Sequence, residues 1–153
     1  MIRNLFFSFF CLSTILFCGC ASSGLPVNFV EGTVIFNAQP LSDALISFIP
    51  KIGGNGIPAI GKTDENGHFF LTSMQGGQPN QGAVAAEYIV VITKNKDKPS
   101  RMEYSTGIDG KPMGIGIYES FVPEKYTLPT TSNLIVTVEK KKRNQFNFVL
   151  DKK

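Results

Sequence analysis

Imidazole chemistry has a single candidate in this chain, because His68 is its only histidine. A metal site built from two or three histidines is therefore excluded. A Ser–His–Asp triad would have to use His68, which directly follows a tight turn and alternates with Phe69. That position is typical of an exposed strand residue. We assign no catalytic residue, and a small hydrolase with a site assembled from scattered residues is kept only as a third functional hypothesis.

Two oxygen-bearing side chains, Asp64 and Asn66, lie close together before Gly67 and could begin a calcium loop. An EF-hand loop needs a glutamate at its twelfth position and helices on both sides. Here the twelfth position is Gln75, and both flanks have strand patterns. A turn explains the same residues, since Asp64 would cap backbone amides and Gly67 would supply a positive φ. We predict this turn with no metal and no cofactor, and keep calcium as the alternative.

The densest charge run is residues 140–143, Lys-Lys-Lys-Arg. These cations could contact anionic lipid head groups or cell-wall polymers. The favoured interpretation is that they solvate a hairpin tip between two apolar strands and discourage pairing at the sheet edge.

A long glycine-rich segment, residues 95–120, begins beside four cations at positions 94–101. A connection of this length in a compact domain is usually functional or disordered. We expect a mobile excursion from one end of the fold, with a short edge strand near 114–118. Its Tyr104 and Tyr118 are candidate ligand-binding residues, because exposed tyrosines can stack on sugars. Phe121 and Tyr126 would instead plug the end of the fold.

The N-terminus has the pattern of an export signal. Residues 5–18 (LFFSFFCLSTILFC) are apolar, follow Arg3 and carry no charge. This stretch is shorter than the roughly 20 residues of a bilayer span and suits the core of a signal peptide. Gly19 and Cys20 then resemble the lipobox of bacterial lipoproteins. The resemblance implies cleavage after Gly19 and a diacylglycerol thioether on Cys20, and a plain secretory signal is the alternative.

A folded domain must position these segments, and the composition indicates one globular domain. The chain has 153 residues, of which 42% are hydrophobic and 18% charged, too apolar for a disordered protein. The net charge of +3 does not indicate a nucleic-acid partner. Period-two alternation predicts about seven short strands, near residues 30–37, 44–50, 59–63, 68–72, 87–93, 134–138 and 145–150. The last two should form a pair around 139–144.

Seven short strands separated by turns predict an all-β fold, a single seven-stranded antiparallel β-sandwich of transthyretin-like or immunoglobulin-like type. We expect a signal peptide at 1–19, a lipid-anchored spacer at 20–28, and the sandwich at 29–151 with the excursion at about 95–120. The residues expected between the sheets are Val34, Phe36, Ile46, Phe48, Val90, Ile92, Val136, Phe146 and Phe148.

Several of these segments resemble a known family. Residues 30–34 (VEGTV), 63–69 (TDENGHF) and 87–90 (EYIV) are similar to the opening, the central turn and a later strand of a carboxypeptidase regulatory-like domain. Residues 122–126 (VPEKY) and 131–134 (TSNL) resemble small planctomycete-type envelope lipoproteins. The resemblance covers most of residues 29–150 and implies a transthyretin-like domain behind a lipobox. It implies no activity, because transthyretin-like hydrolases need several histidines and a C-terminal Tyr-Arg-Gly-Ser.

The first functional hypothesis is a non-enzymatic cell-envelope lipoprotein, a binding or structural module attached to a bacterial membrane through lipid on Cys20. Because no Asp follows Cys20, the outer membrane is the expected location. Its partners would be a cell-wall polysaccharide or an envelope protein, and not nucleic acid. The alternative is a carbohydrate-binding module that uses Tyr104 and Tyr118.

Overall fold

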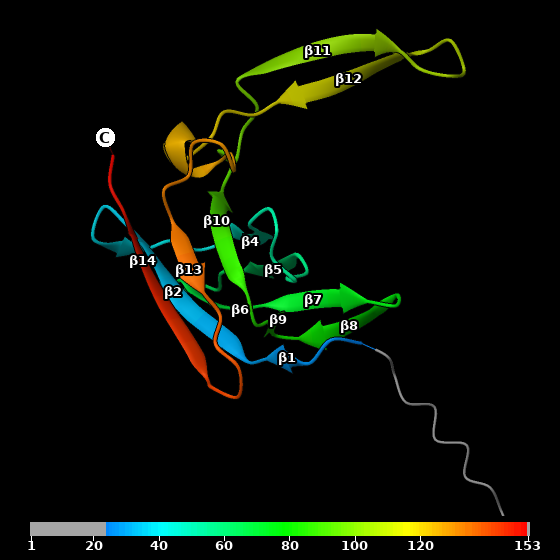
Figure 1. Cartoon of the computed structure of the whole chain (residues 1–153). Helices are drawn as coiled ribbons and strands as arrows, with labels where there is room; N and C mark the ends of the chain where they lie inside the picture. Colours follow the sequence, from blue (N-terminus) through cyan, green and yellow to red (C-terminus); the bar gives the residue numbers. More distant parts are fainter. Residues whose placement is uncertain (1–23, 153) are drawn as a thin grey trace, which may run out of the picture.

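The structure is a computed structural model that describes residues 24–152, and it is an all-β fold (Figure 1). One sheet has six antiparallel strands in the order β13 (Ile135–Thr137), β10 (Glu87–Thr93), β4 (Leu45–Pro50), β5 (Ala59–Lys62), β7 (Thr72–Gln75), β8 (Gln78–Gln81). The second sheet contains β14 (Asn144–Leu150), β2 (Val30–Phe36), β3 (Gln39–Pro40) and β6 (His68–Phe70). Two small sheets pair β1 (Val27–Asn28) with β9 (Ala83–Val84), and β11 (Arg101–Thr106) with β12 (Pro112–Ile117). A 3-10 helix, η1, covers Glu124–Tyr126.

The predicted β-sandwich is confirmed, and each of the seven predicted strands has a counterpart in the two large sheets. The segment predicted as one strand at 68–72 is divided at Leu71, because β6 pairs with β2 in one sheet and β7 pairs with β5 in the other. Leu71 is fully buried at this crossing. The chain therefore turns a corner of the sandwich within one predicted strand.

The two C-terminal strands correct the predicted hairpin. β13 pairs with β10, whereas β14 pairs with β2 over its whole length, from Asn144 opposite Val30 to Leu150 opposite Phe36. The intervening turn thus crosses between the sheets. The β14–β2 pairing is parallel, unlike the other ladders. More than one hundred residues separate these strands along the chain, so no short connection forces an antiparallel arrangement.

The side chain of Asn144 closes this crossing turn. Its amide nitrogen donates to the carbonyl oxygens of Glu139 at 3.2 Å and Lys142 at 3.1 Å, and its oxygen accepts from the Glu139 amide at 2.8 Å. Asn144 is buried. A buried amide whose donor and acceptor are both used stabilises one loop conformation, so this residue determines where the chain leaves one sheet for the other.

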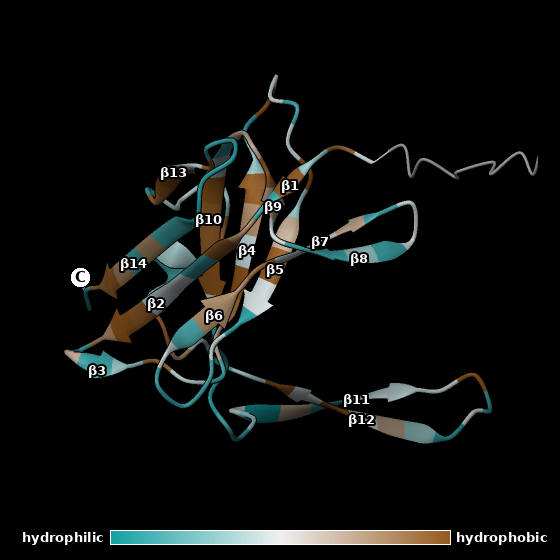
Figure 2. Cartoon of the chain, turned by 90° about the horizontal axis from the view of Figure 1, so that it is seen from below, coloured by the Kyte–Doolittle hydropathy of each residue, from teal (hydrophilic) through white to brown (hydrophobic). Residues whose placement is uncertain are grey.

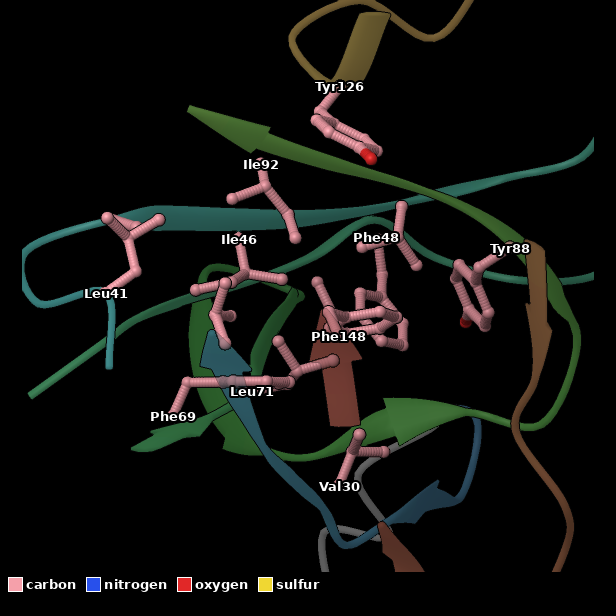
Figure 3. Packing of buried hydrophobic residues seen from close by; sticks show 14 of the residues in the cluster. Val30, Leu41, Ile46, Phe48, Phe69, Leu71, Tyr88, Ile92, Tyr126 and Phe148 are labelled. Atoms are coloured by element: carbon pink, nitrogen blue, oxygen red, sulfur yellow. The ribbon is translucent and has the colours of Figure 1, made fainter. Parts of the chain in front are cut away.

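The predicted core is largely confirmed. The buried members of the predicted set are Val34, Phe36, Ile46, Phe48, Val90, Ile92 and Phe148, while Val136 and Phe146 are partly buried against them. Phe48 lies at the centre, with its ring 5.7 Å from Tyr88 and 6.4 Å from Phe148 (Figure 3). Figure 2 shows hydrophobic residues concentrated on β4 and β10. Within residues 24–152, no helix is long and apolar enough to cross a bilayer.

Candidate functional site

Residues 95–120 form a two-stranded ribbon, called the ribbon below, which stands apart from both large sheets (Figures 1 and 2). The predicted edge strand near 114–118 corresponds to β12, but β12 pairs with β11 and not with an edge of the sandwich. The ribbon follows the C-terminal end of β10, whereas β1, near the start of the described residues, lies beside β9 at the other end of β10. The ribbon and the N-terminal segment therefore lie at opposite ends of the molecule.

A tight turn forms the ribbon's tip. The Gly110 amide donates to Gly107 O at 2.9 Å, and the Gly107 amide donates to Lys111 O at 2.8 Å. Gly110 has a φ of 76°, the left-handed conformation that completes a three-residue hairpin loop with a bulge. Ile108 is fully exposed in this loop. The glycines thus explain how a polar, glycine-rich segment forms a hairpin.

The ribbon's base is attached to the sandwich. Phe121 N donates to Lys94 O at 2.6 Å, and Lys94 Nζ donates to Ser42 O at 2.8 Å. The ammonium group lies 5.2 Å from the centre of the Phe121 ring, which packs against the ring of Phe36 at 5.8 Å. Phe121 therefore partly covers the end of the sandwich, as predicted, although almost half of its surface remains exposed. Tyr126 is buried in the core.

Tyr104 and Tyr118, the predicted ligand-binding residues, lie on the same face of the ribbon. Tyr104 is opposite Gly114 in the ladder, and side chains alternate between faces along a strand, which places Tyr118 on this face as well. A Cβ built on Gly114 would lie 3.2 Å from the Tyr104 ring, and one on Gly116 would lie 3.1 Å from the Tyr118 ring. The tyrosines therefore cover the glycines, and Tyr104 remains 74% exposed.

The opposite face of the ribbon is aliphatic. Met113 and Ile115 are exposed on it, and Ile117 follows at the same spacing. Arg101 and Glu103, two positions apart along β11, form an ion pair on this face, with Nη2 and Oε1 2.6 Å apart. The sequence prediction missed these apolar residues, although the alternation of methionine and isoleucine with glycine in residues 113–117 was a usable signal.

The cations near the ribbon's base are mostly paired. Lys96 Nζ lies 2.5 Å from Glu119 Oε2, and its hydrogen bond and charge lower the pKa of Glu119. Lys94, Lys96, Lys98 and Phe121 line a shallow hollow at this base. In that hollow the described side chains provide cationic and aromatic contacts, but Lys94 and Lys96 already have partners within the chain.

Cys20, the predicted lipidation site, lies outside the described residues. The first described residues are attached to the sandwich through Gln75, whose side chain accepts from Leu25 N at 2.7 Å and donates to Leu25 O at 3.1 Å. Regular pairing begins two residues later, at Val27. The orientation of the chain at this end is thus determined only a few residues after Cys20.

The basic run at 140–143 is partly neutralised and lies beside the N-terminal strand. Arg143 donates to both carboxylate oxygens of Glu31, at 2.6 and 2.9 Å, and Lys142 pairs with Glu139. The Lys141 amide donates to Asn28 Oδ1 at 2.7 Å. The run is therefore the crossing turn between the sheets, and not the tip of a hairpin.

The turn at Asp64 has the geometry expected of a capped turn. One carboxylate oxygen, Asp64 Oδ1, accepts from the amides of Asn66 and His68, both at 2.8 Å. Gly67 has a φ of 74°, and its carbonyl accepts from Val34 N at 2.9 Å. His68 is exposed, as predicted. No group of three or more His, Cys, Asp and Glu residues suited to a metal occurs in the described part of the chain.

Known proteins show little similarity to this chain. No family model matches the sequence, and no curated protein matches it. A solved structure, that of a 9R-lipoxygenase from Cyanothece PCC8801, is similar with a TM-score of 0.37 and 15% identity. The match covers 82% of this chain and 16% of the lipoxygenase.

Proposed function

We propose that this chain is a lipid-anchored cell-envelope protein whose sandwich presents the ribbon as a binding element. One observation supports the binding part: the ribbon exposes apolar side chains on both faces, including Tyr104 and Ile115, and no strand of the two large sheets pairs with it. Exposed apolar surface of this kind commonly marks an interaction site. No catalytic step is part of the proposal.

The attachment part depends on Cys20. Lipidation there would leave four residues before Gly24, and fully extended residues span about 3.3–3.6 Å each, so the sandwich would lie within about 20 Å of the bilayer. The N-terminal segment and the ribbon occupy opposite ends of the molecule (Figure 1). A lipid on Cys20 would accordingly hold the ribbon away from the membrane surface, where it could meet a partner in the envelope.

The basic turn supports the same orientation. Asn28 connects it to the N-terminal end, since its oxygen accepts from Lys141 and its amide donates to Ala83 O at 3.4 Å. Nearby cations add about 1 kcal/mol each to membrane attachment on an anionic surface. Lys140 and Lys141 are exposed beside the proposed anchor, and so would face the lipid head groups.

A carbohydrate ligand is the second candidate, favoured by the placement of Tyr104 and Tyr118 on one face. Aromatic rings that share a face can stack on the apolar faces of sugar rings. Binding to a glycan array would then be lost in the Tyr104→Ala/Tyr118→Ala variant and kept in Met113→Ala, which alters the opposite face. Equal binding by both variants would exclude a sugar site on the tyrosine face.

The test of the proposed function compares the full-length chain with a variant in which residues 97–118 are replaced by a short Gly-Asn-Gly turn. Asn95 and Ser120 already form a bridge, and the buried core does not include residues 95–120. We expect unchanged melting and unchanged lipidation, but loss of binding to the partner that the wild type retains, either isolated cell-wall polysaccharide or solubilised envelope protein. Unchanged binding would overturn the role of the ribbon, and an unmodified Cys20 would overturn the anchor.

A further inference from the structure

The outer edge of β12 is open for pairing with another strand. Because Gly107 and Lys111 are a hydrogen-bonded pair, and bonded and non-bonded pairs alternate along an antiparallel ladder, Ser105–Met113 and Glu103–Ile115 bond inside the ribbon. The backbone groups of Pro112, Gly114 and Gly116 consequently point away from β11. Pro112 agrees with this pattern, because a proline lacks the N–H that an inward position would need.

This edge has little of the protection that exposed edges usually have, because Pro112, at the first position of β12, is its one residue of a type that blocks pairing. Proteins commonly block an edge strand with charged side chains or cover it. β12 has the sequence Pro-Met-Gly-Ile-Gly-Ile without a charge, whereas β11 carries Arg101 and Glu103. The two glycines leave the backbone accessible, and the rings of Tyr104 and Tyr118 cover them from one face, an arrangement that supports glycine in a strand.

We propose that the occupant of this edge is a second copy of the chain, which pairs β12 with β12 in antiparallel orientation about Ile115. Two copies would form a continuous four-stranded sheet, β11–β12–β12–β11, with twofold symmetry. The proposal rests on the ribbon being the binding element, and it names that element's partner.

The register follows from the side chains. With Ile115 opposite itself, the outward-pointing Gly114 pairs with Gly116 of the other copy, so each of the two symmetric pairs exchanges both backbone hydrogen bonds. Met113 then lies opposite Ile117. Directly opposed apolar residues on one face stabilise a pair of strands, and the exposed aliphatic face of the ribbon becomes continuous across the two copies.

Charge complementarity selects this register over its neighbours. Lys111 and Glu119 flank the uncharged strand at equal distances from Ile115, four residues on each side. Antiparallel pairing about Ile115 therefore places Lys111 of each copy opposite Glu119 of the other. A shift of the centre to Gly114 or Gly116 loses both pairs. Lys96, which pairs with Glu119 within the chain, and Asp109, which lies 3.7 Å from Lys111, would extend each pair into a set of alternating charges.

The test is disulfide cross-linking of the full-length chain in isolated membranes under mild oxidation. In a non-hydrogen-bonded pair the two Cα atoms lie about 4.5 Å apart, which is within reach of a disulfide. Ile115→Cys should give at least tenfold more covalent dimer than wild type, whose own cysteines all lie in residues 1–20. Ile108→Cys, fully exposed at the tip, is the matched control for chance collisions and should resemble wild type.

Two further variants test the register. Met113→Cys or Ile117→Cys alone should give no more dimer than wild type, since each residue would be four positions, about 13 Å, from its own counterpart. A mixture of the two variants should cross-link as efficiently as Ile115→Cys. Equal yields from Ile108→Cys and Ile115→Cys, or cross-linking of Ile115→Cys to a different protein, would overturn the proposal.

A charge exchange separates self-pairing from a purely structural effect. Lys111→Glu should lower the cross-linking of Ile115→Cys severalfold, and adding Glu119→Lys should restore it. The double change also removes the ion pairs Lys96–Glu119 and Asp109–Lys111 within each chain. Failure of this restoration would overturn the register. A lipidated chain without the dimer would contradict self-pairing alone, whereas a cross-linked chain without lipid on Cys20 would contradict the anchor alone.

Discussion

Gly67 illustrates how one backbone position connects a turn to the sandwich. Its φ is 74°, and a Cβ placed on it would lie 2.6 Å from the carbonyl oxygen of Val34, in β2. Gly53 has a similar φ of 87° but has no atom within 4 Å of that position. The two glycines therefore differ in surroundings and share the backbone conformation.

Replacement of each glycine by alanine should separate strain from steric clash. Gly53→Ala should cost about 1–2 kcal/mol, the strain of a left-handed non-glycine residue, and Gly67→Ala should cost at least about 1 kcal/mol more. Urea denaturation of both variants and the wild type measures the difference. Equal losses in the free energy of unfolding at the two positions would contradict the close approach of β2 to this turn.

Asp64 provides a second prediction at the residue scale. Because Asp64 Oδ1 accepts from two amides, Asp64→Ala should lower the free energy of unfolding by about 1–3 kcal/mol, while Asp64→Asn, which keeps an oxygen acceptor, should lose less. If the turn is structural, millimolar calcium or excess chelator should leave the melting temperature unchanged. A melting temperature that rises with calcium concentration would instead show a metal site.

At the scale of elements, the parallel pair β2–β14 is joined by an ion pair at its start. Arg143 precedes β14 and binds the Glu31 carboxylate in β2 through two hydrogen bonds. These hydrogen bonds are the main cause that holds the pKa of Glu31 below its ordinary value of 4.5; burial opposes them, and the charge of the guanidinium adds to them. The pair links the second strand of the chain to its last.

The lowered pKa of Glu31 predicts a pH dependence with a definite sign. Below about pH 4.5 the unfolded chain binds more protons at this residue than the folded chain does, so stability rises with pH in that window. The contribution is complete above it and disappears as pH falls through the folded-state pKa. The melting temperature of Arg143→Gln should therefore fall less than that of wild type between about pH 6 and pH 3. If the melting temperatures of the two proteins fell in parallel with pH, a stabilising role for the Arg143–Glu31 pair would be contradicted.

At the scale of the whole molecule, the arrangement of the two ends carries the functional proposal. The N-terminal segment, held by Gln75 and beside the basic turn, lies at one end, and the ribbon lies at the other. A lipid at the first end and a binding element at the second would form an extended connector between the membrane and its partner. Pairing of ribbons would then join two anchored copies away from the bilayer.

The anchor is testable through the two neighbouring cysteines. Cys20→Ser should leave a precursor without the thioether, and the mass of the N-terminal peptide would be that of the unprocessed chain. Cys18→Ser is the matched control and should be cleaved and acylated like the wild type. Acylation that persists in Cys20→Ser, or that is lost only in Cys18→Ser, would place the modification elsewhere.

Sequence alone determined most strands of the two large sheets, but not β3 or β8, together with most of the core and the turn at Asp64, because each depends on neighbours a few residues away. Alternation shows which side of a strand is apolar, so Ile46 and Phe48 could be assigned to the core. Tyr104 and Tyr118 were selected by residue type and by their place in the long glycine-rich segment, which does not show that they share a face.

Only the tertiary structure decided which strands are neighbours. β13 and β14 adjoin in the chain, and their alternation is equally compatible with one hairpin or with two sheets. The pairing of β14 with β2 resolves this choice through residues more than one hundred positions apart. The ribbon is a second example. The alternation within residues 101–117 does not show that both large sheets leave the ribbon uncovered. Whether a strand is covered depends on contacts distant in the sequence, and short-range patterns carry no information about them.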